Sequence, residues 1–123
     1  MIGYVTIGVS DIEKAKSFYT ELLAPLGASL LMDAGRIAFI GTAMDAPMLA
    51  VCTPYDENDP ACGNGNMIAI NPGSKEKVSE FYHRALALGA TDEGEPGQRI
   101  EDMFYGAYVR DADGNKVCFF QFA

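Results

Sequence analysis

The side chains best suited to covalent or proton-transfer chemistry are three cysteines, Cys52, Cys62 and Cys118, and the single histidine, His83. A thiol becomes a strong nucleophile when a neighbouring base takes its proton, so a Cys/His pair would be the arrangement to find. His83 lies in a segment with the apolar period of a helix and is expected to be exposed there, away from Cys118. We therefore expect no Cys/His nucleophile.

Cys52 could face a pocket, but a one-residue change of register would reverse its direction, and a buried structural thiol is the default.

Other polar and aromatic residues could bind a ligand. Asp111 and Asp113 are paired carboxylates, yet they stand in a D-A-D-G-N hairpin signal and are expected to make the hydrogen bonds of that turn. Arg99, in EPGQR, could hold a carboxylate or phosphate of a ligand, with a surface salt bridge as an equal alternative. Tyr105 and Tyr108 fall on opposite faces of one strand, so only one can face a cavity. The choice stays open, and Tyr105 is taken as a candidate pocket residue.

Composition limits the class of protein. A chain of 123 residues that is 49% hydrophobic fits one globular domain. Its formal net charge of -8 opposes nucleic-acid binding, because that needs clustered Lys and Arg, and the nine basic residues are scattered. No apolar run reaches the roughly 20 residues of a membrane span, and the start lacks the features of a signal peptide. With an odd number of cysteines without paired spacing, we expect reduced thiols, a cytoplasmic location, and no nucleic-acid or membrane partner.

An internal repeat organises the chain. Residues 4–7 match residues 67–70, and residues 18–19 match residues 81–82, in both cases 63 positions apart. Each copy opens with residues of strand character and then changes to the apolar period of a helix. The repeat predicts two successive modules, each beginning with a strand and an amphipathic helix.

Capping and turn signals give the remaining elements. Ser10 with Glu13 forms a capping box that predicts a first helix near residues 11–23, and Gly27 and Gly89 are expected to end the two helices. Further strands are expected at 28–32, 36–41, 47–53, 105–110 and 116–122, with a weak strand near residue 91 and a loop over 94–98. The expected organisation is one domain of two βαβββ modules, at about 1–54 and 66–123, with a polar linker at about 55–65.

These modules resemble the vicinal-oxygen-chelate superfamily, which includes glyoxalase I, bleomycin-resistance proteins, fosfomycin-resistance enzymes and extradiol dioxygenases. The resemblance covers nearly the whole chain. It implies an α+β fold in which tandem βαβββ modules form a curved half-barrel sheet around one pocket. The motifs that carry it are YVTIGVSDIEKAKSFY at 4–19, LLAPLG at 22–27, GNGNMIAI at 63–70, EPGQR at 95–99 and YGAYVRDADGNKV at 105–117.

The resemblance also indicates where a metal would be bound. Family members that use a divalent metal hold it with strand side chains, and this sequence has Tyr4, Met67 and Cys118 where the usual residues are His, His and Glu. A phenol with a pKa near 10 and a thioether are poor ligands for Fe(II), Mn(II), Ni(II) or Zn(II). We therefore expect no metal cofactor, with a soft Cu(I) site and plain core packing as the alternatives.

The leading hypothesis is a metal-free protein that binds a small aromatic or carboxylated molecule in a cleft. The candidate pocket residues are Tyr4, Met67, Arg99, Tyr105 and Cys118. The alternative is a glyoxalase-type lyase or dioxygenase with a non-standard or displaced active site, acting through Tyr4 or Cys118. A third possibility is a subunit with a vestigial cavity. Exposed sheet edges and the habits of the family lead us to expect a homodimer.

Overall fold

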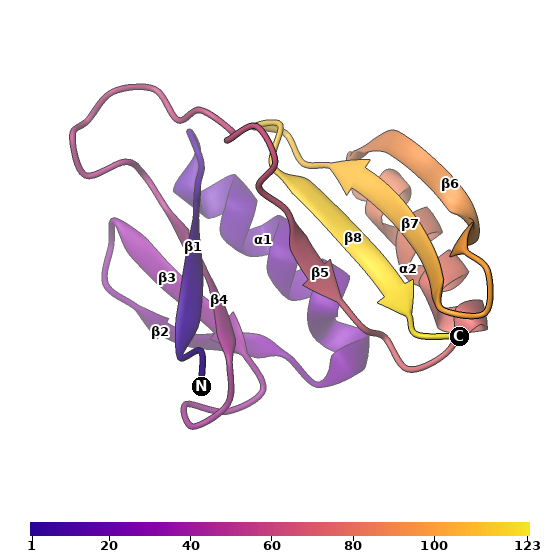
Figure 1. Ribbon diagram of the computed structural model, residues 1–123. Coiled ribbons are helices and arrows are strands. Elements are labelled where there is room, and N and C mark those ends of the chain that lie inside the picture. The colour runs from indigo at the N-terminus through magenta and orange to yellow at the C-terminus, as the bar shows by residue number, and fades with distance from the viewer. The chain divides into compact units, whose positions relative to one another are not determined.

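The chain forms two compact units, each built from one helix and one four-stranded sheet (Figure 1). The computed structural model describes all residues, 1–123. The first unit is Met1–Ala61 and the second is Cys62–Ala123, so the boundary lies inside the segment expected to be a linker. Neither of the two long helices, nor any other helix, has the length and apolar character needed to cross a membrane.

Unit one follows the expected βαβββ order. Its elements are β1 (Tyr4–Gly8), α1 (Ile12–Leu23), the 3-10 turn η1 (Ala24–Leu26), β2 (Ser29–Asp33), β3 (Ile37–Gly41) and β4 (Met48–Cys52). The strands lie in the order β1-β4-β3-β2, with β1 parallel to β4 and the other neighbours antiparallel.

Unit two repeats this plan. Its elements are β5 (Ile68–Ile70), α2 (Lys75–Ala87), β6 (Thr91–Ile100), β7 (Phe104–Arg110) and β8 (Lys116–Gln121). The strand order β5-β8-β7-β6, with β5 parallel to β8, is that of unit one. The α+β fold with two βαβββ modules is therefore confirmed.

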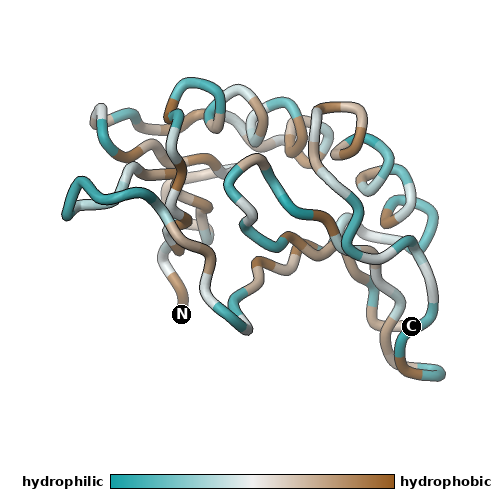
Figure 2. Tube along the Cα trace, turned by 90° about the horizontal axis from the view of Figure 1, so that it is seen from above, coloured by the Kyte–Doolittle hydropathy of each residue, from teal (hydrophilic) through white to brown (hydrophobic).

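Each helix covers one face of its own sheet. In unit one, α1 buries Ala15, Tyr19, Leu22 and Leu23, and it packs against β2, β3 and β4. In unit two, α2 packs in the same way against β6, β7 and β8. Apolar and polar stretches alternate along both helices in Figure 2, as expected when one side of a helix faces a core. This packing divides the residues of every strand between a helix-covered face and a helix-free face.

The first helix begins one residue later than the capping box predicts. The N-cap is Asp11, whose Oδ1 accepts a hydrogen bond from the backbone N–H of Lys14 at 3.1 Å. Asp11 has the extended backbone of a cap residue, and its carboxylate also suits the positive end of the helix dipole. The structure thus uses Asp11 as the cap instead of the predicted Ser10. The predicted stops are confirmed, because Gly27 and Gly89 have φ values of 82° and 108°.

The expected loop over 94–98 is wrong, because these residues belong to β6. This strand pairs with β7 along Thr91–Ile100, but its register shifts three times, between residues 92 and 94, 94 and 97, and 98 and 100. Each shift admits an extra residue as a bulge. Pro96 is tolerated because β6 is the edge strand and needs no partner for that position on its outer side. Gly and Pro therefore mark bulges here rather than the end of pairing.

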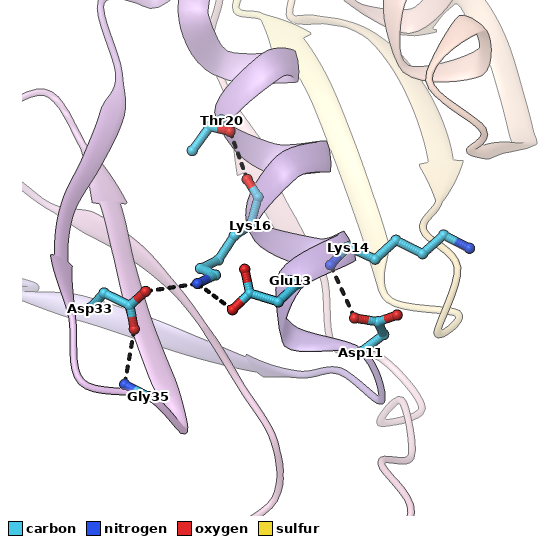
Figure 3. A network of polar contacts seen from close by, with 7 residues as sticks. All are labelled: Asp11, Glu13, Lys14, Lys16, Thr20, Asp33 and Gly35. Atoms are coloured by element: carbon cyan, nitrogen blue, oxygen red, sulfur yellow. Dashed lines mark hydrogen bonds and ion pairs between the residues drawn. The ribbon is translucent and has the colours of Figure 1, made fainter.

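A lysine fastens α1 to the end of β2 (Figure 3). The Lys16 Nζ lies 2.7 Å from Asp33 Oδ2 and 2.7 Å from Glu13 Oε1. Asp33 also accepts a hydrogen bond from the backbone N–H of Gly35 at 2.9 Å. The hydrogen bond from Lys16, followed by that from Gly35, holds the pKa of the Asp33 carboxyl below its ordinary value. The hydrogen bond to Asp33, followed by that to Glu13, raises the pKa of Lys16.

Tyr82 ties α2 to β6, and its replacement tests this contact. The Tyr82 hydroxyl donates to Asp92 Oδ1 at 2.8 Å, and burial, reinforced by this bond, raises the pKa of Tyr82 to about 12. We expect Tyr82→Phe to lower the free energy of unfolding by about 1 kcal/mol, measured by chemical denaturation at pH 8. Tyr55→Phe is the control, because Tyr55 is 87% exposed and its loss should change nothing.

The raised pKa also gives this contact a pH dependence. Because folding favours the neutral phenol, the stabilisation is fully present below the ordinary pKa of 10.0 and is lost as the pH rises through about 12. The difference in stability between wild type and Tyr82→Phe should therefore shrink between these two values. An unchanged difference at pH 11.5 would contradict this account.

Candidate functional site

Alternation along β7 and β8 assigns their side chains to the two faces of the unit-two sheet. Val109 pairs with Val117, and Ala107 pairs with Phe119; all four are buried. The ring of Phe119 lies 5.8 Å from that of Phe81 on α2, so these residues form the helix-covered face. The residues between them, on both strands, point to the helix-free face. Because this ladder has no register shift, the assignment holds along its whole length.

Two of the three positions that replace the family's metal ligands share the helix-free face. Cys118 pairs with Ala69 in the parallel ladder of β5 and β8, so both lie on one face. Met67 precedes Ala69 by two residues, immediately before β5, and follows the same alternation. Met67 is 40% exposed, whereas Cys118 has no exposed surface. The thioether is therefore accessible and the thiol is not.

The Cys118 thiol is in its neutral form at physiological pH. Burial raises its pKa to about 11, against the smaller opposing effects of the positive charges on Lys116 and Arg99. A nucleophilic or metal-binding cysteine needs the thiolate. Neither role suits Cys118 in this environment.

The two tyrosines of β7 lie on opposite faces of the sheet. Tyr108 pairs directly with Cys118 and lies on the helix-free face. Tyr105 has the opposite parity, and the Nζ of Lys75, on α2, lies 5.4 Å from its ring centroid. The candidate pocket residue Tyr105 thus lies on the helix-covered face, away from Cys118 and Met67. The hairpin was the signal for Tyr108, because its two strands pair Tyr108 directly with Cys118.

Tyr108 lies between two cations. The Cζ of Arg99 is 5.3 Å from its ring centroid, and the Nζ of Lys116 is 5.0 Å from it. Both distances allow an attractive cation–π contact. Arg99 also donates a hydrogen bond to the backbone carbonyl of Glu95. Arg99, a predicted ligand-binding residue, therefore contacts Tyr108, as does Lys116, which was not among the candidates chosen from sequence.

Two glycines make room for this tyrosine. A Cβ on Gly94 would lie 2.8 Å from Cδ2 of Tyr108, and a Cβ on Gly106 would lie 2.8 Å from Cε1 of Phe104 and 3.5 Å from the Tyr108 hydroxyl oxygen. Any side chain at either position would displace an aromatic ring. The glycines of β6 and β7 thus have a packing role on the helix-free face.

Aromatic rings gather farther along the same face. Phe104 and Phe120 stack with ring centroids 5.4 Å apart and an angle of 3° between their planes. Phe122 contacts both rings edge-on, at 6.0 Å and 4.9 Å, and is 68% exposed. This aromatic cluster of Phe104, Phe120 and Phe122 is absent from the candidates chosen from sequence.

A hollow of about 470 Å³ lies at the other end of this face. Its walls are the segment 62–67, and Arg110 and Lys116 complete its lining. Arg110 is already engaged, because its Nη2 lies 3.1 Å from Glu93 Oε1 and its Nη1 donates to the carbonyl of Gly114 at 2.9 Å. The lining combines the polar side chains of Asn64, Asn66, Arg110 and Lys116 with the apolar side chain of Met67.

Unit one presents a less polar version of the same face. Tyr4 is 51% exposed, and its ring meets that of Phe39 edge-on at 4.9 Å. Ala50 occupies the position equivalent to Cys118, because it pairs with Thr6 as Cys118 pairs with Ala69. Cys52 pairs with Gly8, has the parity of Ala50, and is half-buried. Cys52 therefore points to the helix-free face of unit one.

The side chains present do not fit a hard divalent metal. No three His, Cys, Asp or Glu side chains of the chain form a group that could hold a metal ion. At the replaced ligand positions the donors are a phenol, a thioether and a protonated thiol, none of which is a good ligand for such ions. His83 is exposed on α2, as expected from sequence.

The carboxylate of Asp111 is used by the turn of the β7–β8 hairpin. Asp111 Oδ1 accepts hydrogen bonds from the backbone N–H groups of Asp113 and Asn115, both at 2.9 Å. Asp111 Oδ2 accepts from Nδ2 of Asn115 at 3.0 Å. The prediction of a structural role for Asp111 is confirmed.

Comparison with known proteins agrees with this fold. The Glyoxalase/Bleomycin resistance protein/Dioxygenase superfamily matches residues 1–119. The chain belongs to this superfamily. No curated protein matches the sequence.

Several solved structures share the architecture. A glyoxalase/bleomycin resistance protein from Albidiferax ferrireducens T118 is 34% identical, with a TM-score of 0.86 over 98% of this chain and 97% of that one. A glyoxalase/bleomycin resistance protein/dioxygenase family enzyme from Burkholderia phytofirmans PsJN is 17% identical, with a TM-score of 0.80 over 98% of both chains. TioX from Micromonospora sp. ML1 is 18% identical, with a TM-score of 0.68 over 100% of this chain and 99% of that one. The latter two show likeness of fold alone.

Two thiols of this glyoxalase-type protein, those of Cys62 and Cys118, should differ sharply in reactivity. Cys62 is exposed, whereas Cys118 is buried and, with a pKa of about 11, is about one part in a thousand thiolate at pH 8. We expect a disulfide reagent to modify Cys62 rapidly in the folded protein and Cys118 only after unfolding. Labelling kinetics of the Cys62→Ser and Cys118→Ala variants assign the phases. A fast phase that disappears in Cys118→Ala would show that the thiol is accessible.

Proposed function

We propose that this member of the superfamily binds a small organic molecule on the helix-free face of the unit-two sheet, without a divalent metal. The observation that carries the proposal is the grouping on this face of an accessible thioether, a partly buried tyrosine beside two cations, and a hollow with both polar and apolar side chains in its lining. Small-molecule sites combine apolar and aromatic surface with a few polar groups that orient the ligand. The residues that supply these features are Met67, Arg99, Tyr108 and Lys116.

The chemistry of the replaced ligand positions supports binding without metal. Met67 and Cys118 lie on one face, but they offer a thioether and a protonated thiol. Both suit contact with an apolar surface better than coordination of a hard cation. Cys118 is also poorly placed to serve as a nucleophile, because it is buried and its pKa is raised. These features favour sequestration over a lyase or dioxygenase reaction.

The proposal extends to the setting of the protein. We propose a cytoplasmic homodimer with reduced cysteines, consistent with three free thiols and with sheets whose edge strands are available for pairing. Light scattering coupled to size exclusion measures the oligomeric state directly.

Two tyrosines on one strand provide a matched test of the site. A chelator-treated preparation should be stabilised by at least one member of a panel of aromatic and aliphatic acids, amines and neutral compounds. A ligand at 100 times its dissociation constant adds about 2.7 kcal/mol to the free energy of unfolding. Tyr108→Leu should abolish this stabilisation, whereas Tyr105→Leu, on the helix-covered face, should keep it.

Metal content gives the second measurement. We expect protein purified without chelator to contain far less than one equivalent of Fe, Mn, Ni or Zn. Near-stoichiometric metal, with ligand binding that disappears on its removal, would overturn the proposal. So would a panel in which no compound stabilises the wild type.

A further inference from the structure

The cations on the helix-free face of unit two stand out in an acidic protein. The formal net charge of the chain is -8, because 17 acidic side chains outnumber nine basic ones. Nevertheless, neither Arg99 nor Lys116 takes part in any of the ion pairs, which involve Lys16 and Arg110. Both instead lie against the ring of Tyr108. Their positive charge is available to a ligand.

Lys116 is the cation best placed to meet an anion in the hollow. It lines the hollow together with Arg110, and the charge of Arg110 is already balanced by Glu93. Asn64 and Asn66, in the wall, provide amide groups that can donate further hydrogen bonds. The lining contains no Asp or Glu side chain that would repel an anion.

The aromatic cluster lies at a useful distance from this charge. Lys116 and Phe120 are on the same face of β8, four residues apart, so their Cα atoms are separated by about 13 Å. A lysine side chain extends about 6 Å from its Cα, which leaves a span of about 7 Å if it leans along the strand, comparable with a bicyclic aromatic acid. Tyr108 lies on the neighbouring strand between the two ends.

We propose that the preferred ligand is an aromatic carboxylate, with its carboxylate bound by Lys116, assisted by Arg99, and its ring held against Tyr108 and the aromatic cluster. This inference rests on the proposed function, because it names the ligand class of the same site. A single carboxylate is favoured over a phosphate. One guanidinium nitrogen of Arg99 is already bonded to the Glu95 carbonyl, and the carboxylates of Glu93 and Glu95 are on the adjacent β6 strand. The available positive charge therefore suits one negative charge better than two.

The test compares 2-naphthoate with 2-naphthamide, which has nearly the same shape and no charge. Titration calorimetry at low ionic strength should show the acid binding about tenfold more tightly than the amide, as expected for a charge-assisted hydrogen bond at a partly exposed site. Lys116→Met keeps the apolar stem and should remove this preference, so that the acid and the amide bind with similar affinity. Inorganic phosphate, added as a competitor, should not displace the acid.

Lys75→Met is the matched control. Lys75 also lies over a tyrosine of unit two and carries the same charge, but on the helix-covered face. It should retain the preference for the acid, which separates a contact with Lys116 from a general effect of net charge. Equal binding of acid and amide by wild type, equal losses in both lysine variants, displacement by phosphate, or binding of neither probe would overturn the inference. A neutral panel compound that stabilises wild type but not Tyr108→Leu would leave the proposed function standing in that case.

Discussion

The packing of one helix against one face of each sheet is the constraint on which the rest of the structure depends. Once α2 covers Ala107, Val109, Val117 and Phe119, the alternation of the strands leaves no choice for their neighbours. The opposite face therefore carries four side chains together, those of Tyr108, Lys116, Cys118 and Phe120. The side chains available for binding are thus selected by the burial of others, since a one-residue shift would exchange the two sets.

The repeat explains why two units of the same plan can carry different chemistry. The helix-covered faces of both units are apolar and buried, because each must form a core. The helix-free faces have no such requirement, and they differ: Tyr4 and Ala50 in unit one correspond to Met67 and Cys118 in unit two. Unit two adds Arg99 and Lys116 beside Tyr108 on this face. In a fold made by duplication, the face that does not build the core is free to diverge.

The glycines of unit two connect the irregular edge strand with the proposed site. Gly94 and Gly97 lie at bulges of β6, and a Cβ at either position would come within 3.4 Å of a nitrogen of the Arg99 guanidinium. Gly94 and Gly106 also leave the space that the rings of Tyr108 and Phe104 occupy. A bulge re-aims the residues around it. The Gly- and Pro-rich composition of β6, which resembles a loop in the sequence, is what allows Arg99 and Tyr108 to meet.

Sequence alone determined the repeat, the βαβββ order of both modules, the glycine stops of the helices and membership of the superfamily. These follow from local periodicity, from backbone requirements at Gly27 and Gly89, and from motifs that occupy contiguous stretches. It also located Met67, Arg99 and Cys118 as residues of interest. Only the tertiary structure decided that Tyr108 rather than Tyr105 shares a face with Cys118, and that Lys116 joins Arg99 beside Tyr108. It also decided that Cys118 is buried and that residues 94–98 pair as an edge strand. The face on which a side chain lies, its burial and its charge pairing depend on which side of the sheet the helix covers and on where bulges shift the register. The physical reason is that these two features are set by contacts between residues far apart in the chain.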